Sequence, residues 1–229
     1  MPNTAEGPHE SALAYVPVRG GLSALRRAAA DCRGCPLYAQ ATQTVFGTGP
    51  ARARTVLVGE QPGDQEDRQG LPFVGPAGRL LRKALAEAGM EEEQVYFTNA
   101  VKHFKFAPST STQKRRIHKT PDLREISACR PWLAAELHRV DPALVIALGA
   151  TAGKALFGSS YRVTEARGAL LPVSHWDIPT TLGAEREDTA GSHWFLATVH
   201  PSAVLRAKNR ADAYGGLLSD LRTAARFLA

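Results

Sequence analysis

The sequence contains few cysteines and no long hydrophobic run. No stretch approaches the ~18 to 20 consecutive apolar residues that a membrane span requires. The first twenty residues are polar and contain no apolar core segment, so they do not resemble a secretory signal. Only three cysteines are present, and this small, odd number does not fit a disulfide framework. We therefore expect a cytoplasmic protein that is not embedded in a membrane.

Basic residues outnumber acidic ones in this chain. Lys and Arg total 28 against 22 Asp and Glu, which gives a formal net charge of +6 and a pI of about 9.5. This balance is a mild indication of a polyanionic partner such as nucleic acid. With 229 residues, 44% of them hydrophobic, the chain is long enough for a sizeable core. We predict a flexible N-terminal tail over 1–19 and a single domain over 20–229, without internal repeats.

The order of strand-like and helix-like segments predicts the fold. Short apolar segments bounded by turn residues predict four strands, at 55–58, 94–101, 143–148 and 194–199. Helical patterns lie around them, at 22–31, 78–88, 121–138, 150–157 and 212–227. This alternation is typical of an α/β protein, a three-layer α/β/α sandwich around a central, mainly parallel four-stranded sheet. Two other stretches are expected to be loops, a basic one at 102–121 and a surface loop at 174–192.

The loop after the first predicted strand is the most informative stretch. The strand breaks at Gly59 and Pro62, and a long polar loop then leads to Phe73, which lies among Pro and Gly residues. Glycines let the backbone approach a ligand closely, and an aromatic ring presented there suits stacking on a flat nucleobase. Because the carboxyl ends of parallel strands share one edge, side chains from several strand ends should meet in one pocket. These side chains are Glu60, Gln61, Phe73, Asn99 and His200.

Two of these residues have hydrogen-bonding groups that suit a base. Asn99 carries a donor and an acceptor in one plane and can read the edge of a pyrimidine. His200, in the segment His200-Pro201-Ser202, can donate a hydrogen bond to a ligand oxygen. Taken singly, each is more often structural. Their expected convergence on one edge is what favours a binding site.

The three cysteines are spaced like metal ligands. Cys32 and Cys35 form a Cys-x-x-Cys pair, and Cys129 lies in a predicted helix. Zinc and iron–sulfur sites both use thiolates, and a complete site needs a fourth ligand, for which His103 and His138 are the candidates by position. The alternative is a set of three unligated thiols, with Cys129 packed in the core.

The basic loop contains one histidine surrounded by cations. The segment 114–119 places Lys114, Arg115, Arg116 and Lys119 around His118. As a bare pattern this favours a solvated loop that contacts DNA phosphates, with salt-dependent affinity. The neighbouring positive charges should also lower the pKa of His118, and a neutral imidazole is nucleophilic, as covalent catalysis requires.

Several short motifs occur together and in one order along 32–227. They are Cys32-x-x-Cys35-Pro36-Leu37, Gly59-Glu60-x-Pro62-Gly63, Gly70-x-Pro72-Phe73-Val74-Gly75-x-Ala77-Gly78, Thr98-Asn99-x-Val101-Lys102, Cys129-x-Pro131-x-Leu133 and His200-Pro201-Ser202. Together they resemble the iron–sulfur uracil-DNA glycosylases. Two departures, Gln61 in place of the usual Gly and the inserted segment 114–119, resemble the X-type (UdgX) branch of that family, as does the segment 102–106.

The resemblance implies a uracil-DNA glycosylase-like fold and a 4Fe–4S cluster. Ordinary members have a cysteine directly after the lysine of the fourth motif. His103 stands at that position here, so the resemblance favours His103 over His138 as the fourth ligand beside the three cysteines. The implied partner is uracil-containing DNA, preferably single-stranded, and the implied protein is a monomer.

The resemblance also implies roles for the pocket residues. Uracil would stack on Phe73, Asn99 would read its edge, and His200 would hydrogen-bond its O2 as negative charge develops on the departing base. Gln61 would complete the uracil site and would help to position the sugar or the loop.

The mechanism that the resemblance implies is covalent. His118 would attack C1′ of the sugar once uracil leaves, oriented or activated by Glu60. Arg116 would hold the loop. The residues implied in DNA binding are Lys114, Arg115, Arg116, Lys119 and Ser202. Two alternatives stay open: an ordinary hydrolytic uracil-DNA glycosylase whose loop only binds DNA, and a non-catalytic iron–sulfur protein that binds DNA or acts as a sensor.

Overall fold

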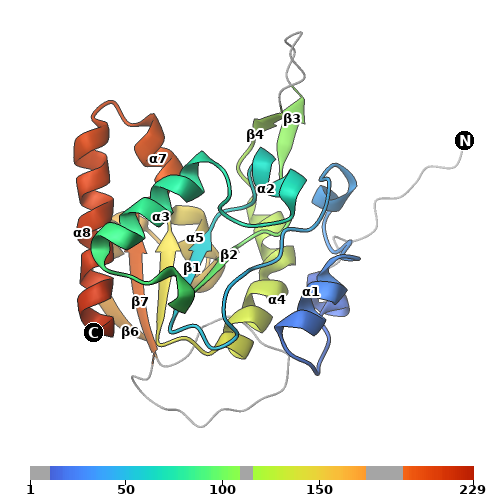
Figure 1. Cartoon of the computed structure of the whole chain (residues 1–229). Coiled ribbons are helices and arrows are strands. Elements are labelled where there is room, and N and C mark those ends of the chain that lie inside the picture. The colour runs from blue at the N-terminus through green and yellow to red at the C-terminus, as the bar shows by residue number, and fades with distance from the viewer. Residues whose placement is uncertain (1–10, 109–115, 174–192) are drawn as a thin grey trace, which may run out of the picture.

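The computed structural model describes residues 11–108, 116–173 and 193–229, and a five-stranded sheet forms its centre (Figure 1). The strand order is β2-β1-β5-β7-β6. Four strands run parallel, namely β1 (Thr55–Gly59), β2 (Val95–Asn99), β5 (Leu144–Leu148) and β7 (His193–Thr198), and β6 (Leu170–Val173) pairs antiparallel with β7. The predicted mainly parallel sheet is confirmed.

The predicted number of four strands is wrong because the sequence gives little sign of β6. This strand lies at the edge of the sheet, is only partly buried, and contains Pro172. Proline cannot donate to a strand ladder and is confined to edges, so a segment that contains it does not resemble a central strand.

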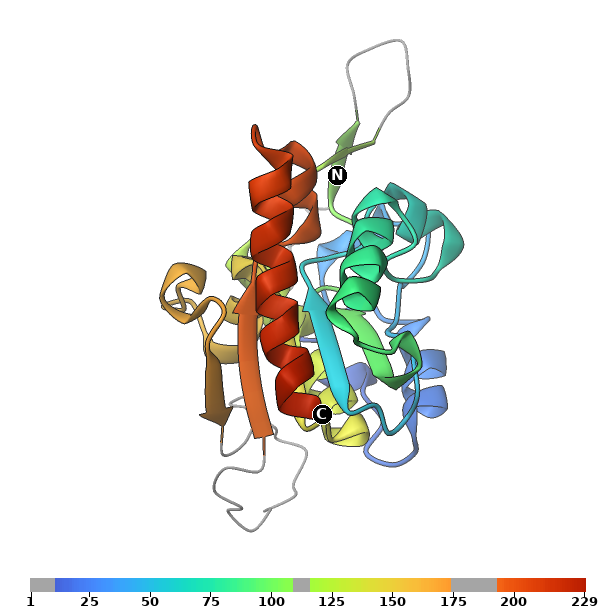
Figure 2. The same cartoon turned by 60° about the vertical axis from the view of Figure 1, so that its left-hand side comes forward.

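Helices cover both faces of the sheet. The five that do so are α1 (Leu22–Ala29), α3 (Pro76–Ala88), α4 (Leu123–Val140), α5 (Ala150–Phe157) and α8 (Arg210–Leu228). Leu57 of β1 is buried in one core with Leu81 of α3 and Leu221 of α8, which runs along its face of the sheet (Figure 2). Its neighbours Val56 and Val58 are buried in a second core, which includes residues of α1, α4 and α5. This alternation has the period of two expected of a strand and confirms the three layers.

Two stretches that the sequence predicts as loops contain secondary structure. The remaining short elements are η1 (Ala12–Tyr15), η2 (Pro36–Ala39), α2 (Asp64–Gln69), η3 (Glu92–Gln94), β3 (Phe106–Pro108), β4 (Arg116–His118), α6 (Val163–Ala166) and α7 (Pro201–Arg206). The loop after β1 includes α2, and the basic loop includes the hairpin β3–β4, in which Phe106 pairs with His118 (Figure 1). Both elements are short and lack apolar periodicity, so their sequences alone do not predict them.

The segment before α1 is packed in part. We predict a flexible tail over 1–19, but η1 lies against α4, and Ala12 and Val16 are buried. Residues 1–10 lie outside the described residues, and so does the predicted surface loop 174–192. The single domain over 20–229 stays a prediction. Within the described ranges, no helix is both long and apolar enough to cross a membrane.

The four parallel strands end at one edge of the sheet. The ends of β1 and β2 lie side by side because Gly59 pairs with Asn99. Immediately beyond β5 and β7 begin α5 and α7. This edge is where the sequence places the candidate site.

Candidate active site

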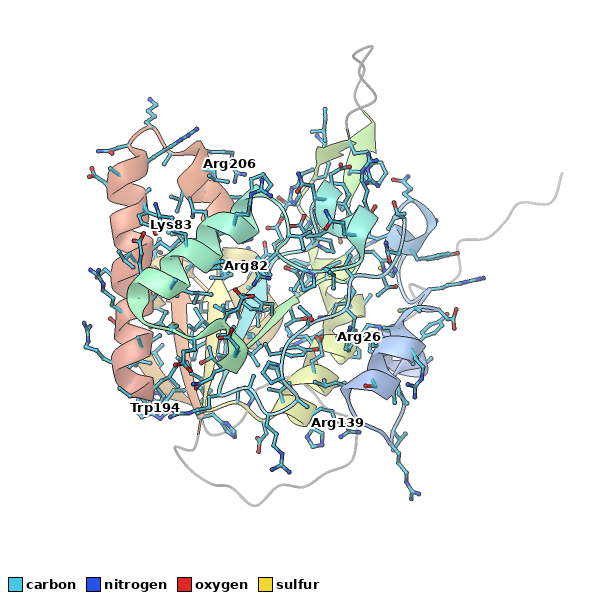
Figure 3. The ribbon with its side chains drawn as sticks, in the orientation of Figure 1. Arg26, Arg82, Lys83, Arg139, Trp194 and Arg206 are labelled. Carbon is cyan, nitrogen blue, oxygen red and sulfur yellow. The ribbon has the colours of Figure 1, made fainter. Side chains whose placement is uncertain are left out.

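A cavity of about 690 Å³ opens at the carboxyl edge of the sheet. Seven of the predicted site residues line it, namely Glu60, Gln61, Phe73, Asn99, His118, His200 and Ser202. Thr151 and Arg206 line it too, although the sequence analysis did not identify them. Thr151 follows the turn after β5, and Arg206 lies at the end of α7 (Figure 3). The rule that strand ends share an edge could have indicated Thr151, but no sequence signal distinguishes Arg206 from other surface arginines.

Phe73 and Asn99 line the cavity beside Gly59, and we call this part of the cavity the slot. A methyl group on Gly59 would overlap Asn99 Oδ1 and would lie 2.7 Å from Phe73 Cζ, so both side chains lie over this glycine. Phe73 and Asn99 are both almost fully buried. Only glycine leaves room for this close approach.

The backbone of Phe73 adopts an unusual conformation. Its φ of +58° lies in the left-handed region, which non-glycine residues rarely adopt. Two neighbours hold it there. Glu66 Oε1 accepts a 2.7 Å hydrogen bond from the Gly75 amide, and the helix start at Gly78 passes too close to the Phe73 carbonyl to allow a side chain. Strain of this kind is typical of residues that are fixed for contact with a ligand.

His200 has a defined tautomer. The Ser202 backbone N–H donates to His200 Nδ1 at 3.1 Å, and Ser202 Oγ lies 2.8 Å from the same nitrogen. Burial lowers the pKa of His200 to about 4, and the nearby His118 and Arg206 act in the same direction. The ring is therefore neutral at pH 7, and because Nδ1 accepts, its proton lies on Nε2. His200 is thus a neutral donor on the wall of the cavity.

His118 has the opposite arrangement at its Nε2. Gln61 is buried, and backbone groups orient its amide: Oε1 accepts from Lys105 N–H at 2.9 Å, and Nε2 lies 2.9 Å from the Lys119 carbonyl and 3.2 Å from the Lys105 carbonyl. Gln61 Nε2 also lies 2.8 Å from His118 Nε2. An amide nitrogen can only donate, so His118 Nε2 accepts and carries a lone pair.

The pKa of His118 is lowered, as predicted, but the cause differs. Partial burial is the main cause, since the side chain is still 48% exposed; the carboxylate of Glu60 opposes it, and Arg206 contributes positive charge. The prediction attributed the lower pKa to the neighbouring loop cations, of which Lys114 and Arg115 lie outside the described residues. A neutral imidazole can act as a nucleophile through this lone pair once the hydrogen bond from Gln61 is released.

Glu60 approaches the same ring nitrogen of His118 as Gln61 does. Its Oε1 is 3.5 Å from His118 Nε2, and its Oε2 accepts a 2.6 Å hydrogen bond from Thr151 Oγ1 at the start of α5. A carboxylate fixed in this way can stabilise positive charge that develops beside the imidazole.

Arg116 anchors the hairpin to the rest of the site. Its guanidinium pairs with Asp64 and with the fully buried Asp67 on α2, and lies 5.3 and 5.0 Å from the ring centroids of Phe104 and Phe106. These contacts support the predicted role of holding the loop. Because both carboxylates occupy the guanidinium, binding of DNA by Arg116 stays a prediction, as does binding by the exposed Lys119.

The three cysteines are buried on the face of the sheet that α4 covers. Cys32 Sγ accepts from the indole N–H of Trp132, and Cys129 Sγ accepts from the Lys102 backbone N–H, both at 3.2 Å. Burial raises the pKa of Cys35 to about 11 and that of Cys129 to about 12, and the neighbouring cysteines add to both shifts. N–H donors to sulfur of this kind are a feature of iron–sulfur sites.

The two candidate fourth ligands differ in position. His103 is buried and directly follows Lys102, whose amide contacts Cys129, and its Nε2 lies 2.8 Å from Thr44 Oγ1. Burial lowers its pKa to about 4. His138 is nine residues after Cys129 on α4, roughly 13 Å along the helix. His103 therefore fits better. Among the described residues, however, no group of three or more His, Cys, Asp or Glu is arranged to hold a metal ion.

Comparison with known proteins gives matches over most of the chain. The model of the uracil DNA glycosylase superfamily matches residues 46–222. A Type-4 uracil-DNA glycosylase of Thermotoga maritima is 35% identical over 199 residues, which cover 86% of this chain and 89% of that protein. The Type-4 uracil-DNA glycosylase of Pyrobaculum aerophilum is 33% identical over 185 residues, with 81% and 85% covered. That of Archaeoglobus fulgidus is 30% identical over 188 residues, with 80% and 83% covered.

Proposed function

The chain belongs to the uracil DNA glycosylase superfamily, and we propose that it excises uracil from DNA and then remains bound through His118 to C1′ of the abasic site. Uracil excision is supported by the Type-4 relatives and by Phe73 and Asn99, which line the cavity and both lie against Gly59. The observation that carries the covalent step is the lone pair of His118 Nε2, which Gln61 fixes 3.5 Å from the carboxylate of Glu60.

Recognition begins with the uracil outside the base stack. A base in a duplex is inaccessible, so the enzyme acts on a flipped nucleotide or on single-stranded DNA. Uracil enters the slot, stacks on Phe73 and presents its edge to the amide of Asn99, with Gln61 beside the sugar. The preference for single-stranded DNA and the monomeric state are also parts of the proposal. The first is tested by comparing excision from single-stranded and duplex DNA, and the second by measuring the mass of the protein in solution.

Cleavage of the glycosidic bond sends its electron pair to uracil N1. Negative charge spreads to O2, where the neutral Nε2–H of His200 donates a hydrogen bond to the leaving anion. The sugar becomes an oxocarbenium-like cation, which the carboxylate of Glu60 stabilises.

His118 then takes the place of water. Its Nε2 lone pair forms a bond to C1′, the ring becomes a cationic imidazolium beside Glu60, and the Nδ1 proton passes to solvent. The product has no good leaving group, so each protein molecule reacts once. This outcome separates the proposal from ordinary hydrolysis, which the similarity to Type-4 uracil-DNA glycosylases supports equally well.

We assign a 4Fe–4S cluster to Cys32, Cys35, Cys129 and His103. Three buried sulfurs with N–H donors on two of them fit such a group. When bound, the cluster would join the segment around η2 to α4, and no chemical step above depends on it.

A denaturing gel tests the function. The protein is mixed with a labelled, uracil-containing single-stranded oligonucleotide and boiled in SDS. We expect label that migrates with the protein, that is lost in His118→Ala, and that is kept in Ile117→Ala, a change at the exposed neighbouring residue. His118→Ser should leave room for water and release alkali-cleavable abasic DNA over many turnovers.

The other outcomes are equally informative. Alkali-cleavable DNA from the wild type, without a protein-linked band, would identify a hydrolytic glycosylase whose hairpin only contacts DNA. An adduct that persists in His118→Ser would exclude His118 as the nucleophile. No change in the DNA would favour a binding or sensor protein.

A further inference from the structure

A fully buried lysine lies directly behind the uracil slot. The side chain of Lys102 is 1% exposed, and its ammonium donates to the main-chain carbonyl of Asn99 and to Thr98 Oγ1, both at 2.7 Å. Asn99 thus contacts Lys102 through its main-chain carbonyl, while its side chain lies in the slot over Gly59. The ammonium therefore holds the backbone from which the base-reading amide projects.

The charge of this lysine is neutralised by one partner. Glu136 of α4, fully buried, pairs with Lys102 Nζ through Oε2. Its carboxylate also accepts from Tyr96 OH at 2.9 Å, from the Gly47 amide at 3.0 Å and from Thr98 Oγ1. Burying two charges costs a large desolvation energy that an apolar pair would avoid, so general stability does not explain the pair. Its position behind Asn99 does.

The backbone of Lys102 reaches a second site. Its N–H donates to Cys129 Sγ at 3.2 Å, while its side chain contacts Asn99 three residues earlier. The turn between is further fixed by hydrogen bonds from Ala100 N to Gly59 O and from Val101 N to Glu60 O, at 2.9 and 3.0 Å. One residue thus connects the slot to a cysteine of the proposed cluster.

We propose that Lys102 is a positioning residue for base recognition, which holds Asn99 in its reading orientation and couples it to the sulfur of Cys129. The part that concerns catalysis rests on the proposed function. An amide held in one orientation accepts from uracil N3–H and donates to O4, whereas cytosine presents the reverse polarity there. If the amide can rotate, discrimination against cytosine is lost together with rate.

The test uses a charge-balanced double variant, Lys102→Met with Glu136→Gln. Removing Lys102 alone would leave a buried carboxylate unpaired and could prevent folding. In the double variant, the side-chain amide that replaces the Glu136 carboxylate still accepts from the Gly47 N–H and still reaches Thr98. The control is Arg167→Met with Asp220→Asn, which removes the 2.9 Å ion pair between Arg167 and Asp220 of α8. Asp220 also accepts from Thr198, and none of these residues belongs to the segment 95–104.

Two measurements are made on each full-length protein. Hydrogen exchange of the segment 95–104 needs no activity, and we expect it to be about tenfold faster or more in the double variant at matched conditions, because the anchoring hydrogen bonds are lost. Single-turnover excision should show a maximal rate about 100-fold lower, with unchanged affinity for DNA and weaker preference for uracil over cytosine. The Arg167→Met, Asp220→Asn control should change neither the exchange of this segment nor the base preference.

These readouts separate the inference from the proposed function. If the double variant keeps wild-type exchange in 95–104, the positioning role is overturned, whatever the protein does to DNA. If exchange rises but the maximal rate and base preference are those of the wild type, the coupling of Lys102 to recognition is overturned. A wild-type protein that excises nothing would refute the proposed function, while the exchange data would still decide whether Lys102 anchors Asn99.

Discussion

Two histidines on one cavity differ in the direction of the hydrogen bond at the same ring atom. At His200, Ser202 donates to Nδ1 and leaves a proton on Nε2, whereas at His118 the amide of Gln61 donates to Nε2 and leaves a lone pair there. Both rings are biased toward the neutral form, mainly by burial. The proposed donor for the leaving base and the proposed nucleophile for the sugar are therefore the same residue type, and their hydrogen-bond partners set the difference between them.

The lowered pKa of His200 predicts a pH dependence of stability. Because the pKa is about 4 in the fold and about 6.5 in an unfolded chain, the unfolded state binds more protons between these values. Stability should be full above about pH 6.5 and should decline as the pH falls toward 4, by about 3 kcal/mol or roughly 5–10 °C in Tm. His200→Asn keeps an acceptor for the Ser202 amide but does not titrate. We expect its Tm to fall less than that of the wild type over this window.

The same comparison contains its own control. Other acid-labile groups are identical in the two proteins, so their effects cancel in the difference between the two Tm profiles. Parallel profiles from pH 7 to 4.5 would show that His200 is not buried in its neutral form.

The sequence predicts which residues form the site better than it predicts how they act. Glu60, Asn99 and His200 follow strand ends, and the edge rule places them together without any further information. The tautomer of His118 depends on Gln61, whose orientation is set by backbone groups of a hairpin that the sequence does not reveal. Arg206 is missed for a related reason, since only the packing of α7 brings it to the cavity.

At the scale of elements, the hairpin β3–β4 is the part that differs most from expectation. Its strands are three residues each and bury little apolar area, so contacts outside the hairpin determine its position. Arg116 provides the main one, because it pairs with two carboxylates of α2 and packs on Phe104 and Phe106. The sequence predicts a solvated basic loop at this point, but Arg116, one of its own cations, fixes the segment to α2.

Removing the contacts of Arg116 should slow the formation of the covalent adduct. In Arg116→Ala the hairpin loses its link to α2, so His118 is held less well in front of C1′, and we expect adduct formation to slow by about 10- to 100-fold. The control is Arg68→Ala, because Arg68 pairs with the same Asp64 but is exposed and does not contact the hairpin. The rate of the protein-linked band is measured on a time course of denaturing gels. Equal rates in both variants would mean that Gln61 alone positions the hairpin.

At the scale of the whole molecule, the fold divides into parts that the sequence can and cannot predict. The four parallel strands are buried, so the sequence reveals them as apolar runs. The main helices can then be predicted from the segments between these runs. The edge strand β6 and the packed segment around η1 depend on neighbours distant in the chain. Ala12 illustrates this, since it is buried in η1, which packs against α4, and its backbone also lies close to Gly34.

The proposed cluster would act on the same part of the molecule. Cys32 and Cys35 lie between α1 and η2, whereas Cys129 belongs to α4, so a shared cluster would cross-link segments almost a hundred residues apart. Removing the iron with an oxidant and a chelator should therefore lower Tm by roughly 10 °C and should speed hydrogen exchange around 12–40, with little change in α8. Cys32→Ala with Cys35→Ala, which cannot load the cluster, should show the same pattern before treatment and no further change after it. Iron removal that leaves both Tm and exchange as in the loaded protein would exclude a structural role, and the three sulfurs would then be packed as ordinary buried thiols.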